Sequence, residues 1–136
     1  MEAIAKPLPR VTPELAPFFE AAKARKLVVQ RCASCGRLRF PPRELCSHCW
    51  SRDAEWVPVS GRGEVFSFYW MHQIYHPGFA AEVPYPVVIV ALEEGPHVLS
   101  NIVGCAREQL RIGLPVEVTF EDASDEVTLP KFRPRG

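Results

Sequence analysis

Residues 32–49 read Cys32-Ala33-Ser34-Cys35-Gly36-Arg37-Leu38-Arg39-Phe40-Pro41-Pro42-Arg43-Glu44-Leu45-Cys46-Ser47-His48-Cys49. This stretch decides the fold, because it holds two Cys-x-x-Cys pairs with ten residues between them. Two thiolates that are two residues apart reach one metal ion from a single tight turn, so two such turns complete a closed tetrahedral site. Gly36 follows the first pair, where the turn favours a residue that tolerates a positive φ. The spacing predicts that a structural zinc ion is bound by Cys32, Cys35, Cys46 and Cys49.

Two other interpretations of the four cysteines are open. Iron is the main competing metal, because a set of four thiolates also holds it. Two disulfide bonds would need an oxidising compartment, and no feature of the chain points to one.

Composition sets the class of protein. The chain has 136 residues with a hydrophobic content of 47%, which is ordinary for a globular protein with one modest domain and an appendage. It contains no apolar run near 18 residues and no apolar core of a signal peptide after Met1. We therefore expect a cytoplasmic protein without a membrane span and with reduced thiols. The fifth cysteine, Cys105, lies in an apolar stretch and is expected to be a free, buried thiol.

The charge of the chain is zero overall but unevenly distributed. Residues 1–60 carry 10 Lys and Arg against 6 Asp and Glu, a net +4, and residues 61–136 carry 6 against 10, a net −4. The basic residues gather around the cysteine pairs. They either form a solvated surface or bind an anion such as a phosphate, a nucleic acid or an acidic partner.

The N-terminal part, residues 1–30, is expected to form an irregular Pro-rich arm followed by a short helix. A helical apolar face is indicated by the spacing of Leu15, Phe18, Phe19 and Ala22. Pro17 suits a first turn, so the helix is predicted from Pro17 to Lys26. Phe18 and Phe19 give this helix an apolar face that packs either on the chain itself or on a partner protein.

The remaining sequence is rich in strands. Residues 26–31 lead into the first cysteine pair and residues 37–40 lead out of it, so residues 31–57 have the plan of a zinc ribbon, in which the metal replaces a large core. Residues 58–136 contain further strands with glycine corners and one long loop at 72–86, which suits a small closed barrel of the OB-fold type. Its strands are expected at residues 64–71, 86–92, 97–103, 116–121 and 128–132.

The assembled motifs resemble one known family. Nearly the whole chain resembles a family that joins an N-terminal rubredoxin-like zinc ribbon to an OB-fold and was long described as a domain of unknown function. The resemblance rests on Phe18-Phe19, Arg31-Cys32-Ala33-Ser34-Cys35-Gly36, Phe40-Pro41-Pro42-Arg43, Cys46-Ser47-His48-Cys49, Gly61-Arg62-Gly63-Glu64-Val65-Phe66-Ser67-Phe68, Pro84-Tyr85-Pro86 and Ile112-Gly113-Leu114-Pro115-Val116-Glu117-Val118. The fold class it implies is mainly β, with a helical arm, a zinc ribbon and a five-stranded OB-fold barrel.

The resemblance also implies a function. Members of the family resemble accessory subunits of thiolases, hydroxymethylglutaryl-CoA synthases, lipid-transfer-type aldolases and some acyltransferases. A chain of this kind would scaffold a thiolase-like partner in a hetero-oligomer and help to bind or channel an acyl-CoA thioester. The alternative is a protein that binds single-stranded nucleic acid, as OB-folds do. The acidic barrel half and the zero net charge argue against that alternative.

The candidate ligand residues lie on both halves. Arginines bind phosphate through paired hydrogen bonds, so Arg39 and Arg43 are the candidates for the CoA phosphates. In the long loop, Tyr75, Phe79 and Tyr85 are candidates for stacking on adenine or lining an acyl channel, unless they only plug the end of the barrel.

Catalysis by the chain alone is not expected. Four cysteines close the metal shell, whereas a catalytic zinc keeps one position open. The sequence contains no Gly-x-Ser-x-Gly elbow and no phosphate-binding glycine loop, and Cys105 has no activating neighbour in sequence.

Overall fold

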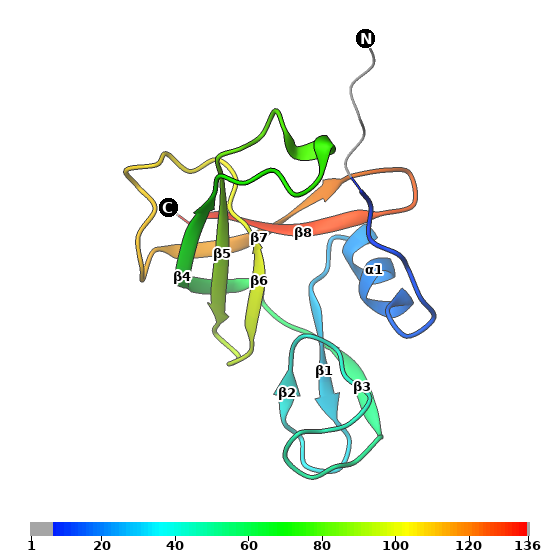
Figure 1. Ribbon diagram of the computed structural model, residues 1–136. Helices are drawn as coiled ribbons and strands as arrows, with labels where there is room; N and C mark the ends of the chain where they lie inside the picture. The colour runs from blue at the N-terminus through cyan, green and yellow to red at the C-terminus, as the bar shows by residue number, and fades with distance from the viewer. Residues whose placement is uncertain (1–6, 136) are drawn as a thin grey trace.

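The computed structural model describes residues 7–135, so part of the expected N-terminal arm, residues 1–6, lies outside the described residues. The described residues form one short α-helix, a three-stranded sheet, a five-stranded sheet and a short 3-10 turn. Figure 1 shows the small sheet hanging from one side of the larger one, with the helix beside both. The helix, α1, is too short to cross a membrane, and the described part of the chain contains no other helix that is long and apolar enough to do so.

Helix α1 spans Ala16–Lys23 and starts with Pro17 in its first turn, as the sequence predicts. Its end differs from the prediction, because the helix stops at Lys23 and not at Lys26. Arg25 adopts a left-handed φ of 63°, and its N–H donates to the carbonyl of Ala22 while that of Lys26 donates to Ala21. This is the Schellman arrangement that normally uses glycine.

The small sheet consists of β1 (Val28–Cys32), β2 (Leu38–Arg39) and β3 (Ala54–Pro58) in the order β2-β1-β3. Both neighbours are antiparallel to β1. Strand β3 is absent from the sequence prediction, and it pairs with the whole of β1 from Val28↔Pro58 to Cys32↔Ala54. This pairing places the first cysteine at the end of the sheet from which both metal-binding turns leave.

The large sheet contains β4 (Arg62–Met71), β5 (Tyr85–Leu92), β6 (His97–Asn101), β7 (Pro115–Asp122) and β8 (Thr128–Pro134), in the order β6-β5-β4-β7-β8. These are the five barrel strands that the sequence predicts, with ends shifted by a few residues. The barrel closes where Ile102 bridges to Phe132 in parallel, next to the hydrogen bond from Val103 N to Phe132 O of 2.8 Å. The mainly β class and the nearly closed five-stranded barrel are therefore confirmed.

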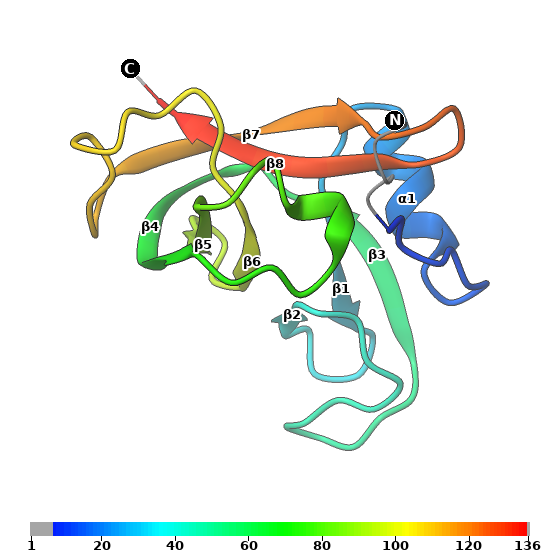
Figure 2. The same cartoon turned by 45° about the horizontal axis from the view of Figure 1, so that its top comes forward.

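The core fills the barrel and continues to the junction with the small sheet. Its most completely buried side chains include Val29, Val65, Val88, Val90, Val116 and Phe132. In Figure 2, α1 lies beside the β7–β8 hairpin. Two contacts tie them together: Arg25 makes a bidentate ion pair with Asp122, with N–O distances of 2.8 and 2.7 Å, and Lys23 Nζ donates to the Asp125 carbonyl at 2.6 Å.

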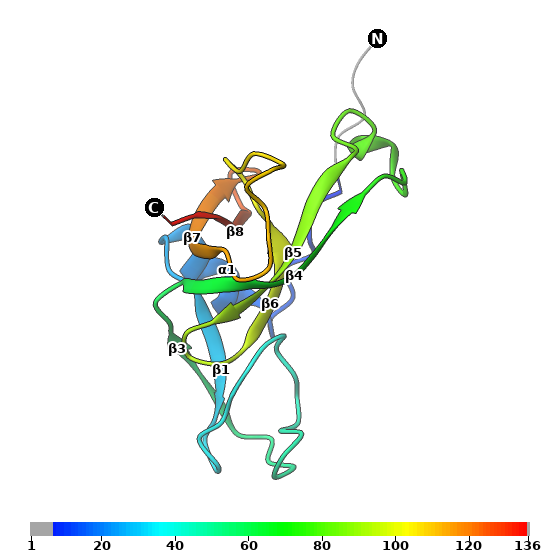
Figure 3. The ribbon, with the colours of Figure 1, turned by 90° about the vertical axis from the view of Figure 1, so that its left-hand side faces the viewer.

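The long loop between β4 and β5 lies outside the barrel body. Figure 3 shows that β4 and β5 extend beyond the other strands and carry this loop at their far end. Its one regular segment is a 3-10 turn at Pro77–Phe79, whose N-terminus is capped by His76 Nδ1 accepting from Gly78 N at 2.9 Å. The fold thus presents two features away from the common core, the metal-binding turns at one end and this loop at the other (Figure 1).

Candidate metal centre and its surroundings

The four predicted cysteines converge at the end of the small sheet. Their sulfur atoms all lie within 4.8 Å of one another, and no other cluster of potential metal ligands is found among residues 7–135. The Sγ atoms of Cys32 and Cys49 are 3.5 Å apart, and those of Cys35 and Cys46 are 3.7 Å apart. A tetrahedron with metal–sulfur bonds of about 2.3 Å has edges of about 3.8 Å. The sulfur positions therefore fit a four-coordinate metal ion.

Backbone N–H groups surround these sulfurs. Cys35 N points at Cys32 Sγ and His48 N points at Cys46 Sγ, each at 3.4 Å. Such donors stabilise negative charge on sulfur and fix the direction of the ligand. They come from the Cys-x-x-Cys turns themselves, which explains why the spacing alone predicts the site.

The thiol pKa values follow from this environment. The backbone N–H of Cys35 lowers the pKa of Cys32 to about 6, and the backbone N–H of Cys49 lowers the pKa of Cys46. The backbone N–H of Ser51 also lowers the pKa of Cys49, but the thiol of Cys32, burial and the other thiols outweigh it and raise that pKa to about 11. Four thiols this close do not all ionise without a cation, so the arrangement favours a bound metal.

Cys105 lies apart from the cluster and has the features of a structural thiol. It is partly buried, its Sγ donates to the carbonyl of Ala106 at 3.4 Å, and burial raises its pKa. A raised pKa reduces the thiolate fraction and so opposes a role as nucleophile.

The structure brings Arg39 and Arg43 together, but not as two free side chains. Gln30 Oε1 accepts from Arg39 Nε and from Arg43 N, both at 2.8 Å, and Arg39 Nη2 donates to Arg43 O at 2.9 Å. The third nitrogen, Arg39 Nη1, is buried and has no hydrogen-bond partner within residues 7–135. Arg39 and Gln30 thus hold the backbone of Arg43, whose own side chain is exposed beside a hollow of about 600 Å³ that Arg52 also lines.

Two of the three candidate aromatic residues of the loop also meet. The rings of Phe79 and Tyr85 are 5.7 Å apart with an interplanar angle of 33°. Tyr75 does not join them: it is 76% exposed and its hydroxyl donates to Gln73 at 3.1 Å. These aromatic residues belong to the barrel, whereas Arg39 and Arg43 belong to the small sheet, and Figures 1 and 3 place the loop on the side of the barrel away from that sheet.

The phenylalanines of α1 pack within the chain. Phe19 is 9% exposed, and the ring of Phe18 lies 5.6 Å from that of Phe40 and 6.3 Å from that of Trp56. Packing on the chain itself buries Phe19, whereas Phe18 is only partly buried, so a partner contact at Phe18 stays a prediction.

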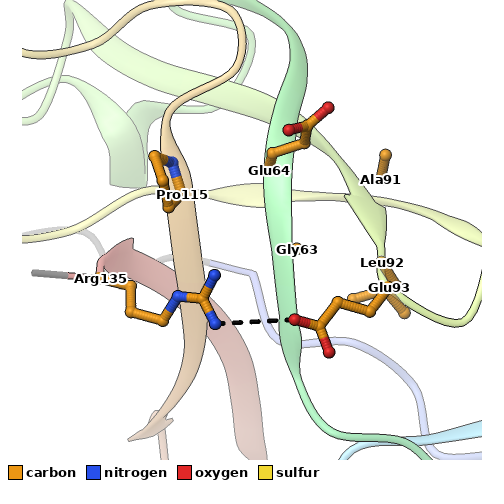
Figure 4. A pocket seen from close by; sticks show the side chains of 7 residues that line it. All are labelled: Gly63, Glu64, Ala91, Leu92, Glu93, Pro115 and Arg135. Carbon is orange, nitrogen blue, oxygen red and sulfur yellow. Dashed lines mark ion pairs between the residues drawn. The ribbon is translucent and has the colours of Figure 1, made fainter.

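A further hollow of about 360 Å³ opens between β4, β5 and β7. Figure 4 shows Arg135 facing Glu93 across it, where their closest N–O distance is 3.6 Å. The lining residues include no cysteine, histidine or serine, so this hollow offers neither a nucleophile nor a soft metal ligand.

Comparison with known proteins assigns both halves of this architecture. The model of the rubredoxin-like zinc ribbon domain of ChsH2 matches residues 19–55, and that of the C-terminal OB-fold domain of ChsH2 matches residues 56–121. A DUF35 domain-containing scaffold protein of Methanocaldococcus jannaschii is 36% identical over 115 residues, which is 79% of this chain and 81% of that protein. The chain belongs to the ChsH2 (DUF35) family.

One further relative of this DUF35 chain is named as an enzyme subunit, and one solved structure that it matches is named as an aldolase. A probable enoyl-CoA hydratase alpha subunit of Thermomonospora curvata is 45% identical over 129 residues, which is 95% of this chain but 40% of that protein. The chain therefore spans about two fifths of that relative. The solved structure titled Ltp2-ChsH2(DUF35) aldolase matches with a TM-score of 0.82 and 45% identity, covering 93% of this chain and 98% of the matched chain.

Three residues of the DUF35 chain stand out in the structure although sequence reasoning did not select them. Gln30 joins Arg39 to Arg43, and Lys131 lines two hollows beside Phe79. Neither residue has a sequence signal, because both roles depend on side-chain direction. Trp50 is different: it follows the second cysteine pair as Gly36 follows the first, and that parallel is visible in the sequence.

Proposed function

We propose that this DUF35 chain is a non-catalytic accessory subunit that scaffolds a thiolase-like catalytic partner and helps it to bind or channel an acyl-CoA thioester. The single observation that carries the proposal is the closed four-sulfur site at the end of the small sheet. A metal with four thiolate ligands has no open position for substrate, so its role is to hold the fold. The chemistry then belongs to another polypeptide.

The metal is proposed to be zinc. The sulfur tetrahedron suits both zinc and iron, and the match to a family model named for a zinc ribbon favours zinc. The small sheet buries few apolar side chains of its own. Zinc bound by Cys32, Cys35, Cys46 and Cys49 would therefore supply much of the stability of the two turns.

The names of similar proteins support the proposal of a partner. The solved match carries the name of a two-component aldolase, and the hydratase relative is named a subunit. The resemblance noted from the sequence points to thiolase-like partners in particular. A hetero-oligomer is the assembly that these names favour for this chain.

For the acyl-CoA we propose two contacts that can be tested separately. Phe79 and Tyr85 flank a hollow of about 330 Å³, and Phe79, Asn101 and Lys131 also line a neighbouring hollow of about 350 Å³, so this side of the barrel suits an acyl or pantetheine chain. Tyr75, which is exposed on the same loop and lines neither hollow, remains the third candidate contact. Arg43 would meet a phosphate, with Arg39 and Gln30 positioning it.

The experiment that tests the proposed function is purification of the tagged chain from its own organism, followed by native mass spectrometry. The expected assembly contains this chain with one zinc ion and a subunit whose peptides identify it as thiolase-like. Recovery of the chain alone, or with a partner of another enzyme class, would overturn the proposal.

The two acyl-CoA contacts are tested on that purified complex. Arg43→Ala is expected to weaken CoA binding while Arg62→Ala, at an exposed arginine paired with Glu93 on the barrel, leaves it unchanged. Phe79→Ala is expected to weaken long-chain acyl-CoA more than free CoA. Equal affinity of wild type and Arg43→Ala for CoA would remove the phosphate assignment and leave the partner assignment standing.

A further inference from the structure

The two metal-binding turns have the same backbone design. In the first, Gly36 N donates to Cys32 O at 2.9 Å and Cys32 N donates to Arg37 O at 2.9 Å. In the second, Trp50 N donates to Cys46 O at 2.9 Å and Cys46 N donates to Ser51 O at 3.0 Å. Trp50 therefore occupies the place in the second turn that Gly36 occupies in the first.

This place requires a left-handed backbone. The φ angle is 77° at Gly36 and 66° at Trp50. Glycine adopts such an angle without steric cost, whereas a bulky residue there is an outlier. Since glycine serves the first turn, holding the metal does not require a tryptophan in the second. Residues kept in disfavoured conformations concentrate at functional sites, so the side chain needs another explanation.

The indole of Trp50 has no partner among the described residues. It is 75% exposed, and within residues 7–135 it makes no ring contact and no hydrogen bond through its side chain. The other two tryptophans behave differently, since Trp56 contacts the ring of Phe18 and Trp70 lies 4.7 Å beneath the guanidinium of Arg107. Trp50 is thus the tryptophan that the fold leaves available for another molecule.

Two exposed arginines belong to the same pair of turns as Trp50. Arg37 directly follows Gly36 and Arg52 lies two residues after Trp50, and neither makes an ion pair within the described part of the chain, although Glu44 and Asp53 are exposed nearby in sequence. The two turns are joined side by side through the hydrogen bond of 2.9 Å between the hydroxyls of Ser34 and Ser51. Figures 1 and 3 place both turns at the end of the small sheet that is furthest from the barrel.

We propose that Trp50 anchors this chain to the catalytic subunit of the complex by entering an apolar pocket whose rim is acidic and faces Arg37 and Arg52. Buried tryptophan and arginine are the residues that most often dominate protein interfaces, and a rigid backbone lowers the entropy cost of docking. Arginine beside tryptophan also suits a stacked nucleic-acid base, but zero net charge and an acidic barrel are unfavourable to nucleic acid. This inference rests on the proposed function, because it names the surface through which the partner binds.

The test uses Trp50→Gly, which removes the indole and gives the turn the residue it favours. The probe is the thiolase-like subunit identified in the purified assembly, with binding measured by calorimetry against wild type, Trp50→Gly and Trp50→Phe. Leu99→Ser is the matched control, since Leu99 is a 61% exposed apolar residue on β6 of the barrel. Trp50→Gly is expected to weaken binding about 30-fold or more, the loss typical of a central anchor, and Trp50→Phe to weaken it less. Leu99→Ser is expected to bind like wild type.

The folded state of each variant is measured in parallel. Trp50→Gly is expected to keep its zinc and to melt at the wild-type temperature or above it. A lower melting temperature or a lost metal would show that the indole is structural and would overturn the inference. The inference would also be overturned if Trp50→Gly bound the partner as tightly as wild type does. A loss of affinity in Leu99→Ser alone would overturn it too, because it would place the interface on the barrel. If wild type bound a single-stranded RNA probe and Trp50→Gly bound it more weakly, the inference would be overturned in favour of nucleic-acid binding.

These outcomes are distinct from failure of the proposed function. If wild type binds the thiolase-like subunit and Trp50→Gly binds equally well, only the anchor is refuted. If wild type forms no complex with a thiolase-like subunit, the proposed function fails first.

Discussion

Gly63 is the position at which a single methyl group should damage the barrel most clearly. It lies in β4 between two neighbouring strands, opposite Leu92 of β5 and Val116 of β7. A Cβ atom at Gly63 would overlap the carbonyl oxygen of Ala91 and would lie 2.9 Å from Val90 Cγ1. The oxygen belongs to the β4–β5 ladder and the valine is fully buried, so neither can move without cost.

The size of the effect follows from that crowding. Gly63→Ala is expected to cost about 3 kcal/mol, the upper end of the range for overpacking, because backbone must shift. Gly104→Ala is the matched control, since Gly104 has a φ of 63° and open space around its Cα. In Gly104→Ala the new methyl group meets no neighbour, so the left-handed backbone at an alanine is the remaining cost, about 1 kcal/mol. For a domain of this size the melting temperature should fall by roughly 10 °C and roughly 4 °C respectively.

Thermal unfolding followed by circular dichroism, in buffer with equimolar zinc, measures both variants. The reasoning is refuted if Gly63→Ala melts within a degree or two of Gly104→Ala, because the close approach of β4 to β5 would then be absent. A loss confined to Gly104→Ala would contradict it equally.

Three other variants test the core, the helix tether and the metal. Phe132→Ala, at the fully buried seam of the barrel, should cost about 4 kcal/mol in urea unfolding, and a cost below about 1 kcal/mol would mean that the barrel is open there. The pKa of Asp122 is lowered from 3.8 to about 2, chiefly by the hydrogen bonds from Arg25 and Thr128 and also by the charge of Lys23. The ionised carboxylate therefore stabilises the folded state above pH 4, and this stability is lost as the pH falls through about 2. Asp122→Asn should therefore have a lower melting temperature than wild type at pH 6, and its melting temperature should fall less than that of wild type between pH 4 and pH 2. If the melting temperatures of both proteins change in parallel with pH, the ion pair between Arg25 and Asp122 does not stabilise the fold. Cys49→Ser should lose the metal and the protection of the small sheet against hydrogen exchange, whereas Cys105→Ser should keep both, and equal metal content in the two would contradict the site.

The sequence predicted those parts of the structure whose causes are local. Two thiolates two residues apart must meet at one turn, so the four cysteines of the metal centre were found by spacing alone. Alternation such as Val116, Val118 and Phe120 identified a half-buried strand of the barrel for the same reason.

Features that depend on distant partners were missed. Strand β3, Ala54–Pro58, has a weak pattern of its own and exists because it pairs with the whole of β1. The end of α1 was placed too late because Arg25 takes a left-handed conformation that sequence rules reserve for glycine.

Side-chain direction was the other limit. Arg39 and Arg43 carry the same charge four residues apart, yet the guanidinium of Arg39 turns to Gln30 and to the Arg43 carbonyl while that of Arg43 is exposed. Phe18 and Phe19 could have faced a partner by sequence, but Phe40 and Trp56 lie against Phe18 within the chain. Only the tertiary arrangement distinguishes these cases.

The central claim is that this chain scaffolds a reaction that another subunit performs. The measurement that tests it most directly is the rate of acyl-CoA turnover by the isolated, zinc-loaded chain, compared with that of the purified complex at equal concentration. The account predicts turnover by the complex and none by the isolated chain. Turnover by the isolated chain that scales with its concentration and disappears in Cys105→Ser would contradict it.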